Sequence, residues 1–422
     1  MDQQIFVYVD LDNMPYLIGR LWLHVRKRVE SATFRYDEGW LQNPERFALE
    51  PALQMDAAPH HTAAGNSLFG AIGDSAPDRW GRALMMRAEA RRARNAGEPA
   101  RTLWEADYLL LVDDETRQGA LRFSAQEGGP FLRQVVDHRT PPLIELPALL
   151  SASERVYDEV GTDEDLRLLL APGSSLGGAR PKASVRDRDG QLAIAKFPHH
   201  GDRISTVLWE GVAFRLASAA GIATAIGRVE RVADRAVFLL RRFDRKGAAR
   251  RPFLSAMSML GATDRETRSY LEIADAIQRY GAAPAEDLHE LWRRIVFSVL
   301  ISNTDDHLRN HGFLYEGNQG WRLSPAYDLN PVPVQFRPRI LSTLIDERSG
   351  DASLELALSV AEYFRLTQTQ ARQTAYEVAK AASRWRREAT TLGISVAEID
   401  LMASAFEHED LAKARKLQIA GL

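Results

Sequence analysis

The sequence predicts an α+β protein with a β-rich N-terminal part, a central part built around a β-hairpin, and a mostly helical C-terminal part. Alternating segments rich in β-formers crowd the first 40 residues, whereas the pattern beyond about residue 246 is mostly helical. Between these regions lies Asp189-Gly190, a dipeptide that favours the tight turn of a hairpin. We expect three parts, over residues 1–125, 150–245 and 246–422.

The N-terminal part is predicted to form a small antiparallel sheet followed by helices. Asp12-Asn13 and Lys27-Arg28 mark the breaks between its strands. A helix is expected to follow Pro77, with Ser75 as its cap, and a second apolar helix comes after it. The strands are Ile5–Val9, Leu17–Val25 and Ala32–Tyr36, and the helices are Asp78–Ala93 and Leu103–Val112.

The central part begins after a proline-rich connection, Pro130–Pro147, with helices that end before Pro172-Gly173. A glycine-rich turn, Ser174–Ala179, then precedes the two strands of the hairpin. An amphipathic helix and one more strand complete this part. These segments are the hairpin strands Ala183–Asp187 and Gln191–Phe197, the helix Ile204–Ala220 and the strand Ala236–Arg241.

Composition excludes several classes of chemistry. The 422 residues carry 54 Lys and Arg against 57 Asp and Glu, so the formal charge of −3 gives no global reason to bind nucleic acid or a membrane surface. The absence of Cys excludes disulfides, thiolate zinc sites and cysteine nucleophiles. No basic, apolar leader and no apolar stretch near 20 residues is found, so we expect a soluble, cytoplasmic protein without membrane contact.

Polar residues occur in the order that phosphoryl transfer from ATP requires. The glycine-rich turn is followed by Lys196, which closes an apolar strand, and by Glu210 on the next helix. Far along the chain, Asp305 and Asn310 stand five residues apart, the spacing of base and metal-binding Asn in protein kinases. Asp328 follows at the end of a strand, and such oxygen ligands suit Mg²⁺.

Each part taken alone also has an ordinary structural explanation. The glycine pair fits a plain turn, Lys196 a strand end in water, Glu210 a solvated helix face, His307 a polar pocket and Asp328 a turn. The density of polar groups over Asn303–Asn310, directly behind the apolar stretch Ile295–Ile301, is harder to explain structurally. The combination in this order therefore favours a kinase site.

Three motifs resemble the HipA family of toxin kinases: Gly173–Lys182, Asn303–Asn310 and Ala326–Pro331. Similarity also extends to Leu17–Arg20 and Phe34–Tyr36, and to the Pro-Asp-x-Trp-Gly-Arg segment within Phe69–Arg82. The resemblance implies a bilobal protein-kinase-like fold and a Ser/Thr protein kinase that uses ATP and Mg²⁺. It also implies a small helix-turn-helix, HipB-like antitoxin as partner, with DNA reached only through that antitoxin.

The resemblance assigns roles to individual residues. Asp305 is the implied catalytic base, with Lys196 and His307 beside it among the catalytic residues, while Glu210 orients Lys196 and Asn310 and Asp328 hold the metal. The implied nucleotide contacts are Leu176, Gly177, Gly178, Ala179, Arg180, Lys196, Arg241, Phe243, Asp244 and His307. The hinge departs from the family pattern, because Arg241 stands where an acid is common.

Autophosphorylation of a loop serine is a further implication, with Ser175 as acceptor or Ser174 as the alternative. A phosphate there repels the phosphates of ATP, so the loop leaves the site. The sequence does not identify the protein substrate; a translation component such as an aminoacyl-tRNA synthetase is the family-level expectation. Two other functions remain open: a catalytically weak scaffold acting as co-repressor with a DNA-binding partner, and a phosphohydrolase using Asp305, Asp306 and His307.

Overall fold

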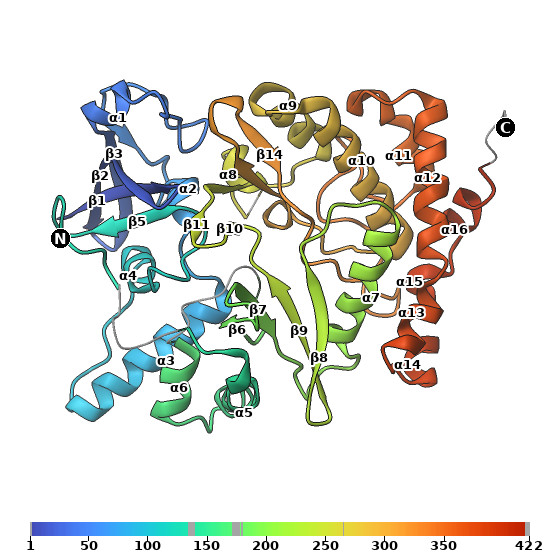
Figure 1. Cartoon of the computed structure of the whole chain (residues 1–422), viewed down its shortest axis with the longest axis horizontal. Coiled ribbons are helices and arrows are strands. Elements are labelled where there is room, and N and C mark those ends of the chain that lie inside the picture. The colour runs from blue at the N-terminus through green and yellow to red at the C-terminus, as the bar shows by residue number, and fades with distance from the viewer. Residues whose placement is uncertain (1, 134–139, 171–177, 179, 265, 418–422) are drawn as a thin grey trace. The chain divides into compact units, whose positions relative to one another are not determined.

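The computed structural model describes residues 2–133, 140–170, 178, 180–264 and 266–417. Two compact units make up the chain (Figure 1). The first comprises Met1–His199, Val232–Asp234 and Leu239–Leu254, and the second comprises His200–Arg231, Arg235–Phe238 and Ser255–Leu422. Among the described residues, no helix has both the length and the apolar character needed to cross a membrane.

The first unit opens with a five-stranded sheet in the order β4-β3-β2-β1-β5. Its three long strands confirm the predicted antiparallel sheet, and both predicted turns have left-handed backbone, with φ of 52° and 66° at Asp12-Asn13 and 50° and 65° at Lys27-Arg28. Such turns match the twist of a two-residue hairpin. The strands are β1 (Asp2–Leu11), β2 (Met14–Arg26), β3 (Val29–Tyr36), β4 (His60–His61) and β5 (Leu121–Ser124).

The helices of the first unit include both of those expected in its N-terminal part, but the cap of the longer one differs from the prediction. Asp78, not Ser75, caps α3, and its Oδ1 accepts a hydrogen bond from the Gly81 N–H at 2.7 Å. The Ser75 hydroxyl instead donates to the Ile72 carbonyl. These helices are α1 (Glu38–Gln42), α2 (Gly70–Gly73), α3 (Arg79–Ala96), α4 (Glu105–Leu111), α5 (Leu146–Tyr157) and α6 (Asp163–Leu170), with the 3₁₀ turn η1 (Leu143–Glu145).

The central hairpin forms as predicted. β6 (Lys182–Arg186) pairs antiparallel with β7 (Leu192–Lys196), and Gly190 supplies the left-handed residue of the turn, with φ of 77°. Lys196 is therefore the last residue of β7. The sheet continues as β6-β7-β9-β8, with β8 (Gly227–Val232) and β9 (Arg235–Arg241); the short strands β10 (Arg245–Lys246), β11 (Ala249–Arg250) and β12 (Phe253–Ser255) follow.

The second unit is mostly helical, as expected. Its longest helix, α10, ends at Ile301, and Ser302 then adopts a left-handed backbone with φ of 53°. Residues Ile295–Ile301 are fully buried or nearly so, which fixes the point where the polar loop begins. The helices are α7 (Thr206–Ala219), α8 (Ala256–Met259), α9 (Tyr270–Tyr280), α10 (Pro284–Ile301), α11 (Leu354–Ser359), α12 (Gln368–Ala382), α13 (Trp385–Thr391), α14 (Val396–Leu401), α15 (Ala403–Phe406) and α16 (Glu409–Ala414), with the 3₁₀ turns η2 (Leu308–Asn310), η3 (Gly317–Gln319) and η4 (Ala361–Phe364).

A β-hairpin lies in the chain between the polar segments around Asn310 and Asp328. The sequence predicted only the strand before Asp328. β13 (Gly312–Tyr315) pairs antiparallel with β14 (Trp321–Leu323), and Ser324 N–H donates to the Gly312 carbonyl at 2.8 Å. The segment before β13 and the segment after β14 therefore leave the hairpin at its same, open end. This places the residues around Asn310 near those around Asp328.

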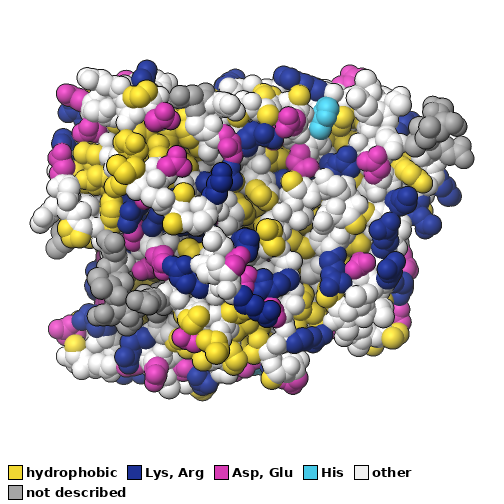
Figure 2. Space-filling view, in the orientation of Figure 1, with side chains coloured by type: hydrophobic (Ala, Val, Ile, Leu, Met, Phe, Trp, Pro, Cys, Tyr) yellow, Lys and Arg dark blue, Asp and Glu magenta, His cyan; other side chains and the backbone are white. Residues whose placement is uncertain are grey.

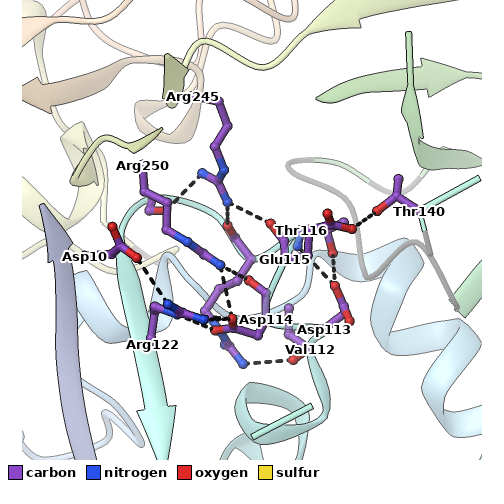
Figure 3. A network of polar contacts seen from close by, with 12 residues as sticks. Asp10, Val112, Asp113, Asp114, Glu115, Thr116, Arg122, Thr140, Arg245 and Arg250 are labelled. Carbon is purple, nitrogen blue, oxygen red and sulfur yellow. Dashed lines mark hydrogen bonds and ion pairs between the residues drawn. The ribbon is translucent and has the colours of Figure 1, made fainter. Parts of the chain in front are cut away.

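A buried ionic network joins the N-terminal sheet to the residues that follow β9 (Figure 3). Arg122 on β5 pairs with Asp10 and Asp114, and Arg250 also reaches Asp114. Arg245 donates to the carbonyls of Glu115 and Arg117 and to the carboxylate of Asp244. Asp244, 1% exposed, also accepts hydrogen bonds from Arg242 and from the Gly119 N–H.

We predict that Asp244→Asn lowers the free energy of unfolding by about 3–5 kcal/mol at pH 7, because it leaves two buried guanidinium groups without a compensating charge. Burial acts to raise the pKa of Asp244, yet the charges of Arg242 and Arg245 outweigh it and hold that pKa well below its usual value. The stabilisation is thus complete above the unfolded pKa and is lost as the pH falls through the lower, folded pKa.

Urea unfolding at several pH values measures this effect. The difference between wild type and variant should be constant from pH 7 to about 5 and should shrink below about pH 4, the ordinary carboxyl pKa. Asp189→Asn is the matched control, because Asp189 pairs with Arg241 at the surface, where such pairs contribute only about 0–1 kcal/mol. Equal losses in the two variants would contradict the prediction.

Candidate functional site

The polar loop between α10 and β13 presents one exposed and one buried carboxylate. The side chain of Asp305 is 61% exposed, whereas Asp306 is 3% exposed. The Asn310 side-chain amide donates to the Asp305 carbonyl at 3.0 Å, which closes the loop on itself. Two residues of the predicted site, five apart in the sequence, are thus held together by a direct bond.

Asp306 anchors this loop through buried hydrogen bonds. Its carboxylate accepts hydrogen bonds from the Tyr270 hydroxyl at 2.5 Å and the Ser298 hydroxyl at 3.2 Å, and His311 Nε2 lies 3.1 Å away. Burial acts to raise the pKa of Asp306, but the neighbouring His311 and the two hydroxyl donors hold it below its usual value. The Thr343 hydroxyl donates to the Asp306 carbonyl. A charged, fully bonded Asp306 therefore fixes the backbone that carries Asp305.

The Asp328 turn is bonded to the same loop through its neighbours. The Tyr327 hydroxyl donates to the Arg309 carbonyl at 2.6 Å. Asn303, fully buried, accepts a hydrogen bond from the Asn330 N–H, and the Asn330 amide donates to the Asp328 carboxylate at 3.2 Å. Asp328 has a left-handed backbone with φ of 59°, a conformation that Asp adopts more readily than most residues.

The residues predicted to hold a metal fit a hard cation. With the Asn310 nitrogen donating to Asp305, the amide oxygen of Asn310 is the atom left for a ligand, and Asp328 adds a carboxylate. Mg²⁺ prefers such oxygen ligands. His307 is half-buried, and its buried Nδ1 has no hydrogen-bond partner among the described residues.

In the first unit, an ion pair that the sequence did not predict lies beside the glycine-rich turn. Lys182 Nζ contacts Asp78 Oδ2 at 2.9 Å, and both side chains are at most 6% exposed. Trp80 donates its indole N–H to the Lys182 carbonyl at 2.9 Å. Gly178 has φ of 87°, and a Cβ at that position would lie 3.3 Å from Lys182 Nζ. Gly178 thus lies beside the buried pair.

Five residues predicted at the glycine-rich turn are not described by the structure, whereas Lys196 and Glu210 are. Ser174, Ser175, Leu176, Gly177 and Ala179 lie outside the described residues. Lys196 is half-buried in the first unit, and Glu210 is 4% exposed on α7 of the second.

The hinge residues are held by structural contacts of the first unit. Arg241 pairs with Asp189, and the ring of Phe243 lies 6.2 Å from that of Phe253. The carboxylate of Asp244 is occupied by the ionic network described above. These contacts give Asp244 a structural role, and its part in binding adenine or ribose stays a prediction.

Basic residues cluster at 78–101 and 241–251, and most of these side chains pair with acidic ones. On α3, Arg82 pairs with Glu105, Arg91 with Asp163 and Arg92 with Glu89. In the second cluster, Arg242, Arg245 and Arg250 belong to the ionic network. Figure 2 shows basic and acidic side chains mixed over the face that it draws. Both clusters therefore have a structural explanation.

Comparison with known proteins adds three findings. The family model described as the HipA-like C-terminal domain matches residues 174–385, half of the chain. A protein of Haemophilus influenzae named "Putative kinase" is 33% identical over 99 residues, which span 22% of this chain and 29% of that protein. The "Putative kinase Y4mE" of Sinorhizobium fredii is 25% identical over 330 residues, which span 70% of this chain and 71% of that protein.

A solved structure is also similar to this chain. A chain in the Shewanella oneidensis toxin–antitoxin complex of HipA, HipB and operator DNA superposes with a TM-score of 0.66 at 16% identity, covering 98% of this chain and 96% of that chain. At this identity the likeness shows the fold alone. It confirms the predicted α+β, HipA-like fold.

We predict that the buried Lys182–Asp78 pair behaves as a coupled unit. Lys182→Met and Asp78→Asn should each lower the free energy of unfolding by about 3–5 kcal/mol, because each leaves one buried group without its partner. The double variant should lose clearly less than the sum of the two. Urea unfolding of the four proteins measures the coupling, and additive losses would contradict it. The exposed pair Arg91–Asp163 is the control cycle, expected to couple by about 0–1 kcal/mol.

Proposed function

The chain belongs to the HipA-like family, and from that premise we propose that it is a Ser/Thr protein kinase that transfers the γ-phosphate of ATP. The observation that carries the proposal is the bonding of three sequence-predicted residues into one constellation. Asn310 bonds directly to Asp305, and the Asp328 turn bonds to the same loop through Tyr327 and Asn330. A phosphotransferase needs a base and two metal ligands brought together in this way.

In this proposal the second unit carries the chemistry. Asp305, exposed beside the closed loop, accepts the proton of the acceptor hydroxyl. Asn310 and Asp328 would hold Mg²⁺, which neutralises charge on the phosphates when it is bound. His307, half-buried in the same loop, would contact the nucleotide phosphates. Asp306 takes no part in the reaction and keeps the loop in place.

The first unit supplies nucleotide contacts in this proposal. Lys196, at the end of β7, would bind phosphate oxygens. Glu210 lies on α7 of the second unit, and its role in orienting Lys196 stays a prediction. The turn over Leu176–Arg180 would cover the phosphates. The three-part division of the chain at 1–125, 150–245 and 246–422 is part of the same proposal.

We further propose a helix-turn-helix antitoxin as partner. The solved neighbour belongs to a complex that contains HipB and operator DNA. The mixed surface charge and the largely paired basic clusters of this chain favour DNA contact through such a partner rather than directly. The acceptor is a Ser or Thr of a cellular protein, such as a translation component.

The decisive test is incubation of the purified protein with Mg²⁺ and γ-labelled ATP, alone and with a lysate. The wild type should transfer label to protein, and Asp305→Asn and Asp328→Asn should each lower the rate by at least about 10²-fold, because positioning and electrostatics provide nearly all of the catalysis. Asp351→Asn, an exposed carboxylate elsewhere in the second unit, should retain the wild-type rate.

A wild type that binds ATP but never transfers phosphate would contradict the kinase proposal and favour the alternative, a catalytically weak scaffold acting as co-repressor with a DNA-binding partner. Release of free phosphate without protein labelling would favour the phosphohydrolase that uses Asp305, Asp306 and His307. Retention of the wild-type rate in Asp305→Asn would remove Asp305 as base while sparing the reaction class.

We also expect the kinase to modify its own glycine-rich turn. Mass spectrometry after incubation with ATP should find phosphate on Ser175, or on Ser174, and the modified protein should lose ATP binding because the added charge of about −1.5 to −2 repels the nucleotide phosphates. The Ser174→Ala, Ser175→Ala double variant should stay active for longer. Label confined to other residues would contradict this expectation.

A further inference from the structure

We propose that Arg337 is a further catalytic residue, which binds the transferring phosphoryl group beside Asp305; this inference rests on the proposed kinase function. Among the described residues, Arg337 is the cation that contacts Asp305, with Nη1 2.7 Å from Oδ1. It lies 32 residues from Asp305 in the chain, and neither the catalytic-loop spacing nor any motif of the sequence indicated it.

The segment that carries Arg337 is fixed to the catalytic loop at both ends. Before Arg337, the Val332 N–H donates to the Ser302 carbonyl at 3.1 Å. After it, Arg339 donates to the Ser302 hydroxyl at 3.1 Å and to the Val299 carbonyl at 2.9 Å. Arg337 is therefore held over the residues that begin the loop and does not belong to an independent surface strand.

Local contacts aim the side chain of Arg337 at Asp305. Its Nη2 lies 3.4 Å from the Ser342 hydroxyl, and Ser342 is bonded to the Thr304 carbonyl through both its N–H and its hydroxyl. Thr304 directly precedes Asp305. The guanidinium is thus supported by the same backbone that positions the proposed base.

The exposure of this ion pair leaves room for a substrate. The side chains of Arg337 and Asp305 are 44% and 61% exposed. A guanidinium has five N–H donors, and one contact to a carboxylate leaves others for phosphate oxygens. Arg309, the other arginine of this region, pairs with Asp264 and not with Asp305.

The chemistry needs a cation at this place. The acceptor hydroxyl oxygen forms a bond to the γ-phosphorus while the bond from phosphorus to the bridging oxygen breaks, ADP leaves with that electron pair, and the hydroxyl proton passes to Asp305. Because the acceptor oxygen must touch Asp305, the phosphoryl group lies within one contact of it and within reach of Arg337. An Arg on the three equatorial oxygens stabilises their charge in the transition state.

Steady-state kinetics of Arg337→Gln and Arg337→Lys test the inference. Arg337→Gln should lower kcat by about 10²–10³-fold, within or below the range for an arginine that stabilises phosphoryl transfer, while KM for ATP changes less than about threefold. Arg337→Lys should recover part of the rate, and added guanidinium should partly restore Arg337→Gln. Such rescue is not expected of a residue that only supports the fold. Arg372→Gln, on the exposed face of α12, is the matched control and should behave as wild type.

The outcomes separate this inference from the proposed function. A wild type without phosphotransfer contradicts the proposed function itself. An active wild type with an equally active Arg337→Gln overturns only the role of Arg337. A rise in KM for the protein acceptor at unchanged kcat also overturns it, because it assigns Arg337 to docking. If Arg337→Gln unfolds, as judged by circular dichroism, the Arg337→Lys variant carries the same comparison.

Discussion

A buried charge that must be neutralised positions the candidate site. Asp306 cannot lose its solvent without polar partners. Two hydroxyl donors come from Tyr270 on α9 and Ser298 on α10, and the imidazole of His311, just before β13, lies beside the carboxylate. Burial and the nearby carboxylate raise the pKa of Tyr270 well above its usual value, so this hydroxyl keeps its proton and remains a donor. Packing of these elements around Asp306 therefore fixes the position of the backbone that carries Asp305.

The sequence predicted the features that arise from local chemistry. Asp189-Gly190 indicated the hairpin, the break at Lys27-Arg28 indicated a turn, and the dense polar groups of Asn303–Asn310 indicated a loop after the apolar stretch Ile295–Ile301. It did not predict contacts between distant segments. Lys182 pairs with a residue 104 positions away, and Arg337 reaches Asp305 across 32, so no local pattern records either contact. The misassigned cap of α3 has a local cause, since both Ser75 and Asp78 are good cap residues.

Asp244 in the first unit shows that a residue of a sequence motif can have a structural role. Asp244 lies in a motif that resembles a nucleotide hinge, yet its carboxylate neutralises Arg242 and Arg245 and accepts the Gly119 N–H. Through Arg245, Arg250 and Arg122 the same network extends to Asp10 on β1 (Figure 3). The hinge is thereby coupled to the N-terminal sheet by charges that cannot be removed one at a time without leaving a buried ion unpaired.

The left-handed backbone of Asp328 has a consequence for how such a protein can change over evolutionary time. Only Gly, Asn and Asp adopt this conformation at low cost. A β-branched or bulky replacement would strain the turn, whereas Asn or Gly would keep it and remove the carboxylate. Each of these two replacements needs a single nucleotide change in an Asp codon. Under the proposed function, either replacement would silence phosphotransfer in one step and keep the folded chain.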